Sequence, residues 1–181
     1  MINENKIIEL LSNDDSRQEG FRLLVTAFRE PIYWHIRRLV VKHEDAQDVM
    51  QECFINVYKY FDNFKGNSSL KTWIYKIATN EALRHCTKRH VEMDSYDQKS
   101  HLAQMFTSER DIDFSSAQAV LQRAILSLPD KQRVTFNLRY FDEMTYEQIS
   151  QITGSSIATL KTNYHYAQTK IKEYVLNNME D

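Results

Sequence analysis

The sequence predicts an all-α protein built from two helical domains that an acidic linker joins. Three glycines and two prolines among 181 residues are too few for a β-sandwich or barrel, which needs a turn about every eight to twelve residues. Hydrophobic residues make up 42% of the chain and charged residues 27%, a balance typical of globular rather than disordered chains. Apolar residues also recur at the three- and four-residue spacing of a helix in both halves of the chain.

The formal net charge of −2 argues at first against a nucleic-acid-binding protein, whose domains are usually basic. The charges are unevenly distributed, however. Residues 65–90 hold six basic side chains and one acidic side chain, Glu81, whereas residues 91–115 hold six acidic and two basic ones. From Ser155 through Lys172 the chain has no acidic residue. Residues 65–90 and the helix expected near the C-terminus are therefore candidates for contact with nucleic acid.

The first half carries three apolar stripes of helical period, which indicate the core of a helix bundle. The first stripe consists of Phe21, Leu24, Val25 and Phe28. Pro31 is expected to open the next helix, whose stripe is Ile32, Ile36 and Leu39. The third stripe lies within residues 45–61 and consists of Ala46, Val49, Cys53, Val57 and Phe61, with Asp48, Gln51, Glu52, Asn56 and Lys59 outside it.

A polar loop is expected between Phe61 and Leu70, with Ser68 or Ser69 as the cap of the helix that follows. That helix is expected to bury Leu70, Trp73, Ile74 and Ile77. On one face of this helix, five residues spaced four apart form a ridge: Thr72, Lys76, Asn80, Arg84 and Lys88.

This ridge offers hydrogen-bonding groups and cations along one helix face, which suits a phosphate backbone. The aromatic residues Phe64, Trp73 and Tyr75 are expected to stack on unpaired bases. A solvated helix face is the alternative interpretation, since most runs of charge are no more than that. The scarcity of acidic residues and the neighbouring aromatic rings favour nucleic acid.

The second half predicts a helix-turn-helix. Leu128 and Pro129 begin a helix that continues to about Tyr140, and a short helix follows Thr145, which has capping-box spacing with Gln148. A turn with Gly154 and a serine cap leads into a helix over 157–174. Its inward positions are expected to be Leu160, Tyr164, Ala167 and Ile171, and its outward ones Thr159, Lys161, Thr162, Asn163, His165 and Tyr166.

Residues 91–115 are expected to form the acidic linker, because they lack a sustained helical period and an apolar stripe. A long surface loop within one domain is the alternative, although loops of that length are uncommon in compact domains. The expected domains are thus residues 1–90 and 116–181.

Other classes of protein find no support in the sequence. Cys53 and Cys86 suit free thiols in a reducing cytosol rather than a disulfide framework or a zinc site. The six histidines show no metal spacing, and no Walker loop, GxSxG or HExxH motif is present. We therefore expect a non-enzyme without cofactor or metal. Without a signal peptide or an apolar run of membrane-spanning length, a cytoplasmic protein is expected.

Two segments resemble the bacterial sigma-70 family of RNA polymerase sigma factors, in its extracytoplasmic-function (group IV) branch. Residues 44–54, EDAQDVMQECF, are similar to the EDAEDxxQExF signature, and residues 64–80, FKGNSSLKTWIYKIATN, to FxGxSxFxTWLYxIAxN. Residues 128–133 and 146–150 resemble the LPxxxR and YxEIA segments of the same branch. The likeness covers about residues 20–90 and 120–175, in the family's order.

The resemblance implies an initiation factor with two DNA-binding domains and gives roles to residues. Core polymerase would be bound by the helix that carries Asp45, Asp48, Gln51, Glu52 and Asn56. The −10 element would be melted and held by Phe64, Lys65, Asn67, Ser68, Ser69, Lys71, Thr72, Trp73, Lys76, Asn80, Arg84 and Lys88, the loop at 64–69 capturing a flipped base. The −35 duplex would be read by Ser156, Thr159, Lys161, Thr162, Asn163, His165 and Tyr166.

The implied partners are the β′ and β subunits of core RNA polymerase, promoter DNA and an anti-sigma factor, with no insertion into a membrane. The acidic linker would pass through the polymerase's RNA path. Asn163 and Tyr166 stand where the family often has arginine, so the −35 preference of other members is not expected here. A stand-alone helix-turn-helix regulator, binding duplex DNA without polymerase, is the alternative function.

Overall fold

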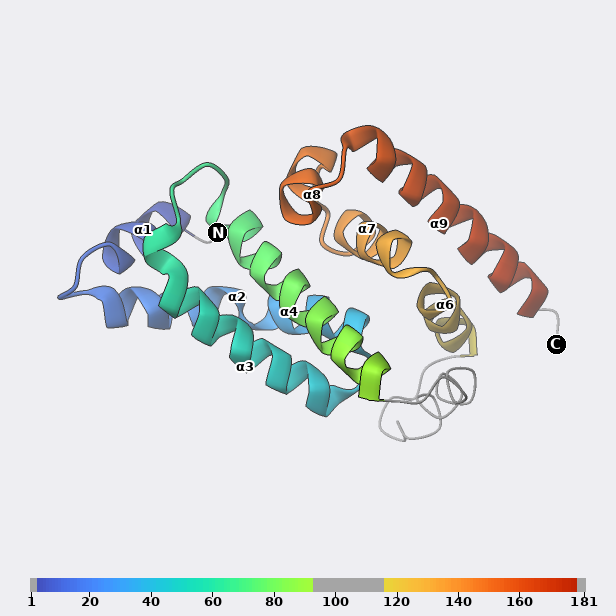
Figure 1. Cartoon of the computed structure of the whole chain (residues 1–181), viewed down its shortest axis with the longest axis horizontal. Coiled ribbons are helices and arrows are strands. Elements are labelled where there is room, and N and C mark those ends of the chain that lie inside the picture. Colours follow the sequence, from blue (N-terminus) through green and yellow to red (C-terminus); the bar gives the residue numbers. More distant parts are fainter. Residues whose placement is uncertain (1–2, 93–115, 179–181) are drawn as a thin grey trace. The chain divides into compact units, whose positions relative to one another are not determined.

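The computed structural model describes residues 3–92 and 116–178, which are helical and contain no strand. The N-terminal unit contains α1 (Glu4–Leu11), α2 (Arg17–Val40), α3 (His43–Tyr60), the 3-10 helix η1 (Phe61–Asn63) and α4 (Leu70–Glu92). The C-terminal unit contains α6 (Ser116–Leu126), α7 (Asp130–Tyr140), α8 (Tyr146–Thr153) and α9 (Ile157–Asn178) (Figure 1). The predicted all-α fold class is therefore confirmed. Of the linker expected over 91–115, the first two residues continue α4 and the rest lies outside the described residues.

Helix α2 corrects one expectation, because Pro31 lies inside it rather than at its start. A proline within a helix removes the hydrogen bond to the carbonyl four residues earlier and costs about 3 kcal/mol. Pro31 is exposed, whereas Phe28 and Ile32 of the neighbouring apolar stripe are buried. The helix stays continuous because the apolar stripe runs from Leu24 to Ile36 without a break, and interrupting it would expose buried area.

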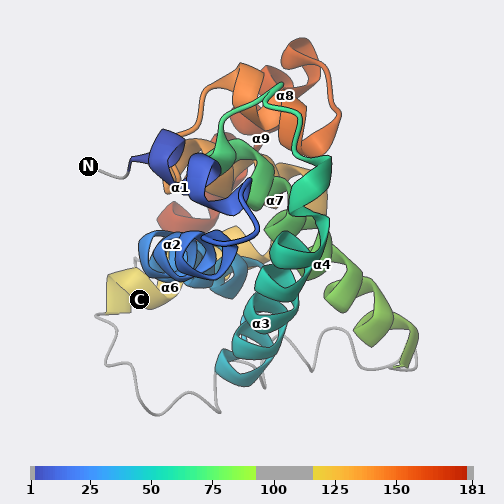
Figure 2. The same cartoon turned by 90° about the vertical axis from the view of Figure 1, so that its left-hand side faces the viewer.

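The core of the N-terminal unit is formed mainly by the buried faces of α2, α3 and α4. In α3 the buried residues include Ala46, Val49, Cys53 and Val57, as the helical period predicts. From α4 the core receives Leu70, Ile74, Ala78 and Ala82. Helix α1 packs against α2 (Figure 2), and it buries Ile7 and Leu11.

In the C-terminal unit, α9 packs against both α6 and α7. The core of this unit contains Ala124, Ile125, Leu128, Phe136, Ala167 and Ile171, and Tyr164 packs against it. The expected capping box is present: the Thr145 amide donates to Gln148 Oε1 over 2.9 Å, and the Gln148 amide donates to Thr145 Oγ1 over 3.3 Å. Gly154, at φ +72°, makes the turn between α8 and α9, a backbone conformation that favours glycine. The predicted helix-turn-helix is thus confirmed as a local structure.

No helix in residues 3–92 or 116–178 combines the length and the apolar character that crossing a membrane requires.

Candidate polymerase and nucleic-acid interfaces

The loop over 64–69 leaves η1 and enters α4 with a defined backbone. At its start, the Phe64 amide donates to the Phe61 carbonyl over 2.8 Å. Gly66 has φ +71°, and no heavy atom lies within 4 Å of where its Cβ would be. At its end, Ser69 Oγ accepts a hydrogen bond of 3.1 Å from the Thr72 amide and so caps α4. Lys65, Asn67 and Ser69 are exposed and Ser68 is half-buried.

Three aromatic rings gather beside this loop. The centroids of Phe64 and Trp73 are 5.4 Å apart, and those of Phe61 and Trp73 are 6.2 Å apart in an edge-to-face arrangement. Phe61 is buried, whereas Phe64 and Trp73 are half-buried. Such rings offer flat apolar faces next to exposed polar residues, a surface on which an unpaired base can stack.

Tyr75 does not belong to this surface, which corrects the expectation that it stacks on a base. Its side chain is 2% exposed, and its ring lies 4.9 Å from that of His35. His35 Nε2 is itself 2.9 Å from Thr79 Oγ1 within the core. The Tyr75 side chain therefore faces α2 rather than solvent and contributes to the packing of the core.

The expected ridge on α4 is exposed at Lys76, Asn80, Arg84 and Lys88. Thr72 departs from it, because its side chain is 2% exposed and its hydroxyl lies 2.8 Å from Ser69 Oγ. Within the first helical turn this hydroxyl pairs with the cap instead of facing solvent. Lys71, at the same end, is half-buried and places its ammonium 5.6 Å from the Tyr75 ring centroid.

On α3, three of the five residues expected to contact polymerase are exposed: Asp48, Gln51 and Glu52. The other two face α4. The Asn56 amide donates to Glu81 Oε1 over 3.0 Å, and the Asp45 carboxylate lies 3.6 Å from His85 Nε2.

Beside Gln51 an apolar groove of about 520 Å³ runs between α2 and α3. Its lining includes Phe21, Val25, Phe54, Ile55 and Tyr58. Ile55 is 57% exposed and Tyr58 43% exposed. The sequence held a signal for this surface, since Ile55 is an apolar residue outside the buried stripe of α3.

Cys53 is buried in the core on α3. Burial raises its pKa to about 12, and the nearby Glu81 carboxylate adds to the effect. At neutral pH the thiol is therefore protonated and inert, which supports the interpretation of Cys53 as a packing residue.

In the C-terminal unit, α9 begins as α4 does. The Thr159 amide donates to Ser156 Oγ over 3.1 Å, and the two side-chain hydroxyls lie 2.8 Å apart. Leu160, Ala167 and Ile171 are buried, as expected. On the outward face, Asn163 is half-buried, whereas the other expected residues are exposed: Ser156, Thr159, Lys161, Thr162, His165 and Tyr166.

Tyr146, the first residue of α8, lies close to two cations near this face. The Arg139 guanidinium lies 5.3 Å from its ring centroid and the Lys161 ammonium 5.9 Å. Cations at such distances are attracted to the ring face. Two positive charges are thus held together near the start of α9, a favourable arrangement for phosphate.

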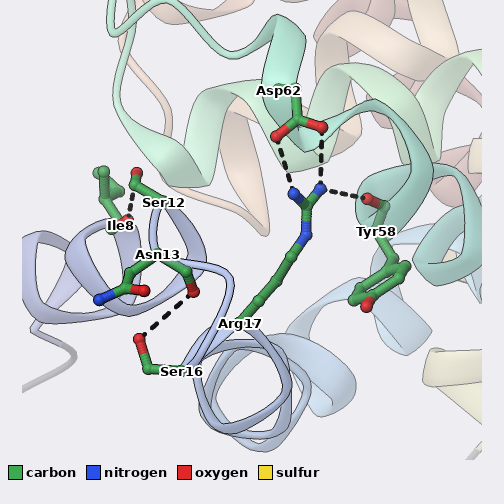
Figure 3. Close-up of polar contacts among 7 residues, drawn as sticks. All are labelled: Ile8, Ser12, Asn13, Ser16, Arg17, Tyr58 and Asp62. Carbon is green, nitrogen blue, oxygen red and sulfur yellow. Dashed lines mark hydrogen bonds and ion pairs between the residues drawn. The ribbon is translucent and has the colours of Figure 1, made fainter.

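Residues near the N-terminus contact both sides of the 64–69 loop, which the sequence did not indicate. Arg17 donates to both carboxylate oxygens of Asp62 and to the Tyr58 carbonyl (Figure 3). Glu4 Oε2 accepts from the Leu70 amide over 2.9 Å. These contacts join positions 45 and 66 residues apart, and single charged residues carry no pattern that would predict them.

Two family models match the chain. Sigma-70 region 2 matches residues 24–91, and Sigma-70, region 4 matches residues 118–170. The RNA polymerase sigma-H factor of Pseudomonas aeruginosa is 29% identical over 178 residues, which cover 93% of this chain and 91% of that protein. The ECF RNA polymerase sigma-E factor of Escherichia coli K12 is 26% identical, over 96% of this chain and 95% of that one.

Solved structures show the same fold. The sigma factor RpoE of Bartonella quintana, in complex with the anti-sigma factor NepR, matches with a TM-score of 0.68 and 21% identity over 87% of this chain and 97% of that one. CnrH, in complex with the cytosolic domain of CnrY, matches with a TM-score of 0.70 and 15% identity over 97% and 98%. Both domains, in the family's order and with relatives that match along nearly their whole length, show that the chain belongs to the sigma-70 family and is an RNA polymerase sigma factor of the extracytoplasmic-function branch.

Proposed function

We propose that the two units divide promoter recognition between them. The domain of residues 1–90 binds core polymerase and opens the −10 element, and the domain of residues 116–181 reads the −35 duplex. Residues 91–115 join them as an acidic linker that passes through the RNA path of the polymerase. The observation that carries the proposal is the group of Phe61, Phe64 and Trp73 rings beside a loop and a cationic helix face.

Opening needs no covalent chemistry from this chain, and we assign it none. Flipping a base out of a duplex costs a few kcal/mol, and stacking on an aromatic face returns about 1–3 kcal/mol per base. The Phe64 and Trp73 faces would supply the stacking, while Lys65 and Asn67 reach the same nucleotide from the loop. Lys76, Asn80, Arg84 and Lys88 would hold the phosphates of the separated strand. In this assignment the Thr72 hydroxyl pairs with the Ser69 cap of α4 rather than contacting DNA.

Polymerase binding is assigned to the exposed side of α3. Asp48, Gln51 and Glu52 offer acidic and amide groups to the polymerase, and the groove lined by Phe54 and Ile55 offers apolar area beside them. Interfaces with an apolar centre and a polar rim are typical of stable complexes. We propose that the polymerase covers both, and that Asn56 and Asp45 support α3 from the side of α4.

Reading of the −35 duplex is assigned to α9. Thr162, His165 and Tyr166 are the exposed side chains that suit base edges, with Asn163 at the margin. Ser156, Thr159 and Lys161, near the helix N-terminus, suit phosphate contacts. Tyr166 and Asn163 in place of the family's arginines support a −35 preference of its own.

An anti-sigma factor is proposed as a second partner, because the similar sigma factor RpoE is solved in complex with the anti-sigma factor NepR. The exposed groove between α2 and α3 suits such a partner, which would then exclude polymerase by competition. The protein is proposed to act in the cytoplasm, where the polymerase and promoter DNA are.

Run-off transcription tests the proposed function. Core polymerase of the source organism, with and without this chain, is given a promoter library, and transcripts are sequenced. The proposal expects transcripts from a defined promoter set only when the chain is present. Tight, specific binding of duplex DNA by the chain alone in a gel shift, without stimulated transcription, would instead support a stand-alone regulator.

The DNA face of α4 is tested by the double variant Lys76→Ala, Arg84→Ala. We expect weaker open-complex formation with unchanged affinity for core polymerase, because the two side chains are exposed on α4. A double variant of two exposed cations elsewhere in the same unit, Lys6→Ala and Arg22→Ala, serves as the control for general loss of charge. Equal loss of polymerase binding would contradict the assignment.

A further inference from the structure

Helix α1 and the first turn of α2 lie before the segment that matches Sigma-70 region 2, which begins at residue 24. They nevertheless make side-chain contacts on each side of the 64–69 loop. These contacts fix where the loop begins and where it ends.

On the upstream side, Arg17 forms a two-point contact with Asp62 of η1. Its two terminal nitrogens lie 2.9 and 3.1 Å from the two carboxylate oxygens. One of them also lies 3.4 Å from the Tyr58 carbonyl, and the guanidinium is 5.4 Å from the Tyr58 ring centroid. The Arg17 side chain is 20% exposed although Asp62 is 72% exposed. A bidentate pair fixes orientation as well as distance, so Asp62 is held two residues before Phe64.

On the downstream side, Glu4 contacts the start of α4. Its Oε2 accepts from the Leu70 amide over 2.9 Å in a partly buried position. The first amides of a helix lack partners within the helix, and a carboxylate is favoured there by the helix dipole. Ser69 covers the Thr72 amide, so Glu4 and Ser69 together fix the first turn of α4 directly after the loop.

Glu4 and Arg17 are also held relative to each other. Ser16 Oγ donates to the Leu10 carbonyl over 2.9 Å, which ties the start of α2 to the end of α1. The two helices approach so closely at Gly20 that an added Cβ would lie 2.8 Å from the Leu11 amide nitrogen. Both contacts with the loop therefore come from one rigid segment.

We propose that Glu4 and Arg17 are positioning residues for −10 opening, acting as an N-terminal clamp that holds Asp62 and Leu70, and thereby Phe64 and the loop, ready for the unpaired base. The inference rests on the proposed function of the loop. Its physical basis is preorganisation: a loop that is already ordered loses less conformational freedom when it binds the base. Neither residue needs to touch DNA for this.

The test uses the full chain bound to core polymerase. Arg17→Ala and Glu4→Ala are measured for affinity to a single-stranded oligonucleotide with the −10 sequence of a promoter that the wild type transcribes. Each variant is expected to lose about tenfold in this affinity and a similar factor in permanganate-reactive open complex. Affinity for core polymerase and for −35 duplex is expected to be unchanged.

Matched variants separate positioning from general destabilisation. Arg22→Ala and Glu9→Ala remove exposed charges from the same two helices and are expected to behave as the wild type. The exchange Arg17→Asp with Asp62→Arg restores the ion pair and should recover most of the −10 affinity. Glu4→Gln keeps an acceptor for the Leu70 amide and should also recover it in part.

The outcomes decide between the inference and the function on which it rests. If Phe64→Ala loses −10 affinity while Arg17→Ala and Glu4→Ala retain it, the clamp is wrong and the function of the loop stands. If Phe64→Ala also binds as the wild type does, the proposed function of the loop fails. A loss that parallels weakened polymerase binding or a lower unfolding temperature, without recovery in the exchange variant, overturns the clamp as a positioning device.

Discussion

The side-chain amide of Asn56 on α3 donates a 3.0 Å hydrogen bond to the carboxylate of Glu81 on α4. Glu81 also pairs with Arg84, one turn further along α4. Glu81 is 14% exposed and Arg84 67% exposed, so one mostly buried carboxylate joins the helix proposed to bind polymerase to a cation proposed to bind DNA.

Removing this carboxylate's charge is expected to strengthen the salt dependence of DNA binding. Glu81→Gln keeps an acceptor for Asn56 but leaves Arg84 without its ion pair, so the Arg84 charge is no longer partly neutralised and can act in full on phosphate. The slope of log affinity against log salt should steepen by up to about one, as measured by fluorescence anisotropy with the polymerase-bound chain. Glu9→Gln, an equal charge change on α1, is the control, and an unchanged slope for Glu81→Gln would contradict the prediction.

Trp73→Ala is expected to damage both packing and promoter opening. The ring packs on Phe61 and Phe64, and removal of a half-buried indole should lower the free energy of unfolding by about 2 kcal/mol. Permanganate reactivity of the −10 region, measured at a temperature where the variant is folded, should fall as well. Wild-type reactivity in the folded variant would refute the role in opening and leave only the packing role.

On α9, Lys161 is expected to contact phosphate and Tyr166 to contact bases, so their substitutions should have different effects. Lys161→Ala should weaken binding to all −35 sequences evenly and reduce the salt slope by about one, because its ammonium suits phosphate. Tyr166→Ala should change which −35 sequences are selected, by a factor that corresponds to about 1–3 kcal/mol per base pair. Selection from a randomised −35 library distinguishes them, and an unchanged selected sequence for Tyr166→Ala would exclude base contact by this residue.

Gly20→Ala tests the close approach of α1 and α2. An alanine in a helix is favoured over glycine by about 1 kcal/mol, but its Cβ would lie 2.8 Å from a backbone nitrogen, and overpacking costs about 1–3 kcal/mol. We expect a net loss of about 1 kcal/mol in urea unfolding. Gln18→Ala, at an exposed position of the same helix, should be neutral, and stabilisation by Gly20→Ala would show that α1 yields at this point.

Much of the fold could be predicted from the sequence because helical period and caps are local signals. The stripe of Ala46, Val49, Cys53 and Val57 is buried, Ser69 caps α4, and Thr145 and Gln148 form their box. The expected helix start at Pro31 is wrong, because burial along the whole of α2 outweighs the local preference of proline for a first helical position. Val41, a β-branched residue with φ +71°, shows a strained turn between α2 and α3 that no local propensity predicts.

For the candidate site, the type of residue could be predicted from the sequence, but the direction of its side chain could not. Tyr75 and Thr72 have side chains suited to nucleic acid, yet both are buried. Asn56 has the polarity of a surface residue, yet it pairs with Glu81. Thr72 is turned inward by the nearby Ser69 cap. Tyr75 and Asn56 are held by contacts over long separations in the chain, as are Arg17 and Glu4, and such contacts leave no periodic trace in a single sequence.

The buried Cys53 has a practical consequence for experiments on this protein. The chain has two cysteines, and Cys53, with its raised pKa and no exposed surface, will not react with thiol-directed dyes while the protein is folded. The other, Cys86, is partly exposed on α4, two residues after Arg84. A thiol-directed dye is therefore expected to react at Cys86 alone, where the thiol donates to the Leu39 carbonyl of α2 over 3.7 Å, and so to report on the contact between α4 and α2 without engineering a cysteine.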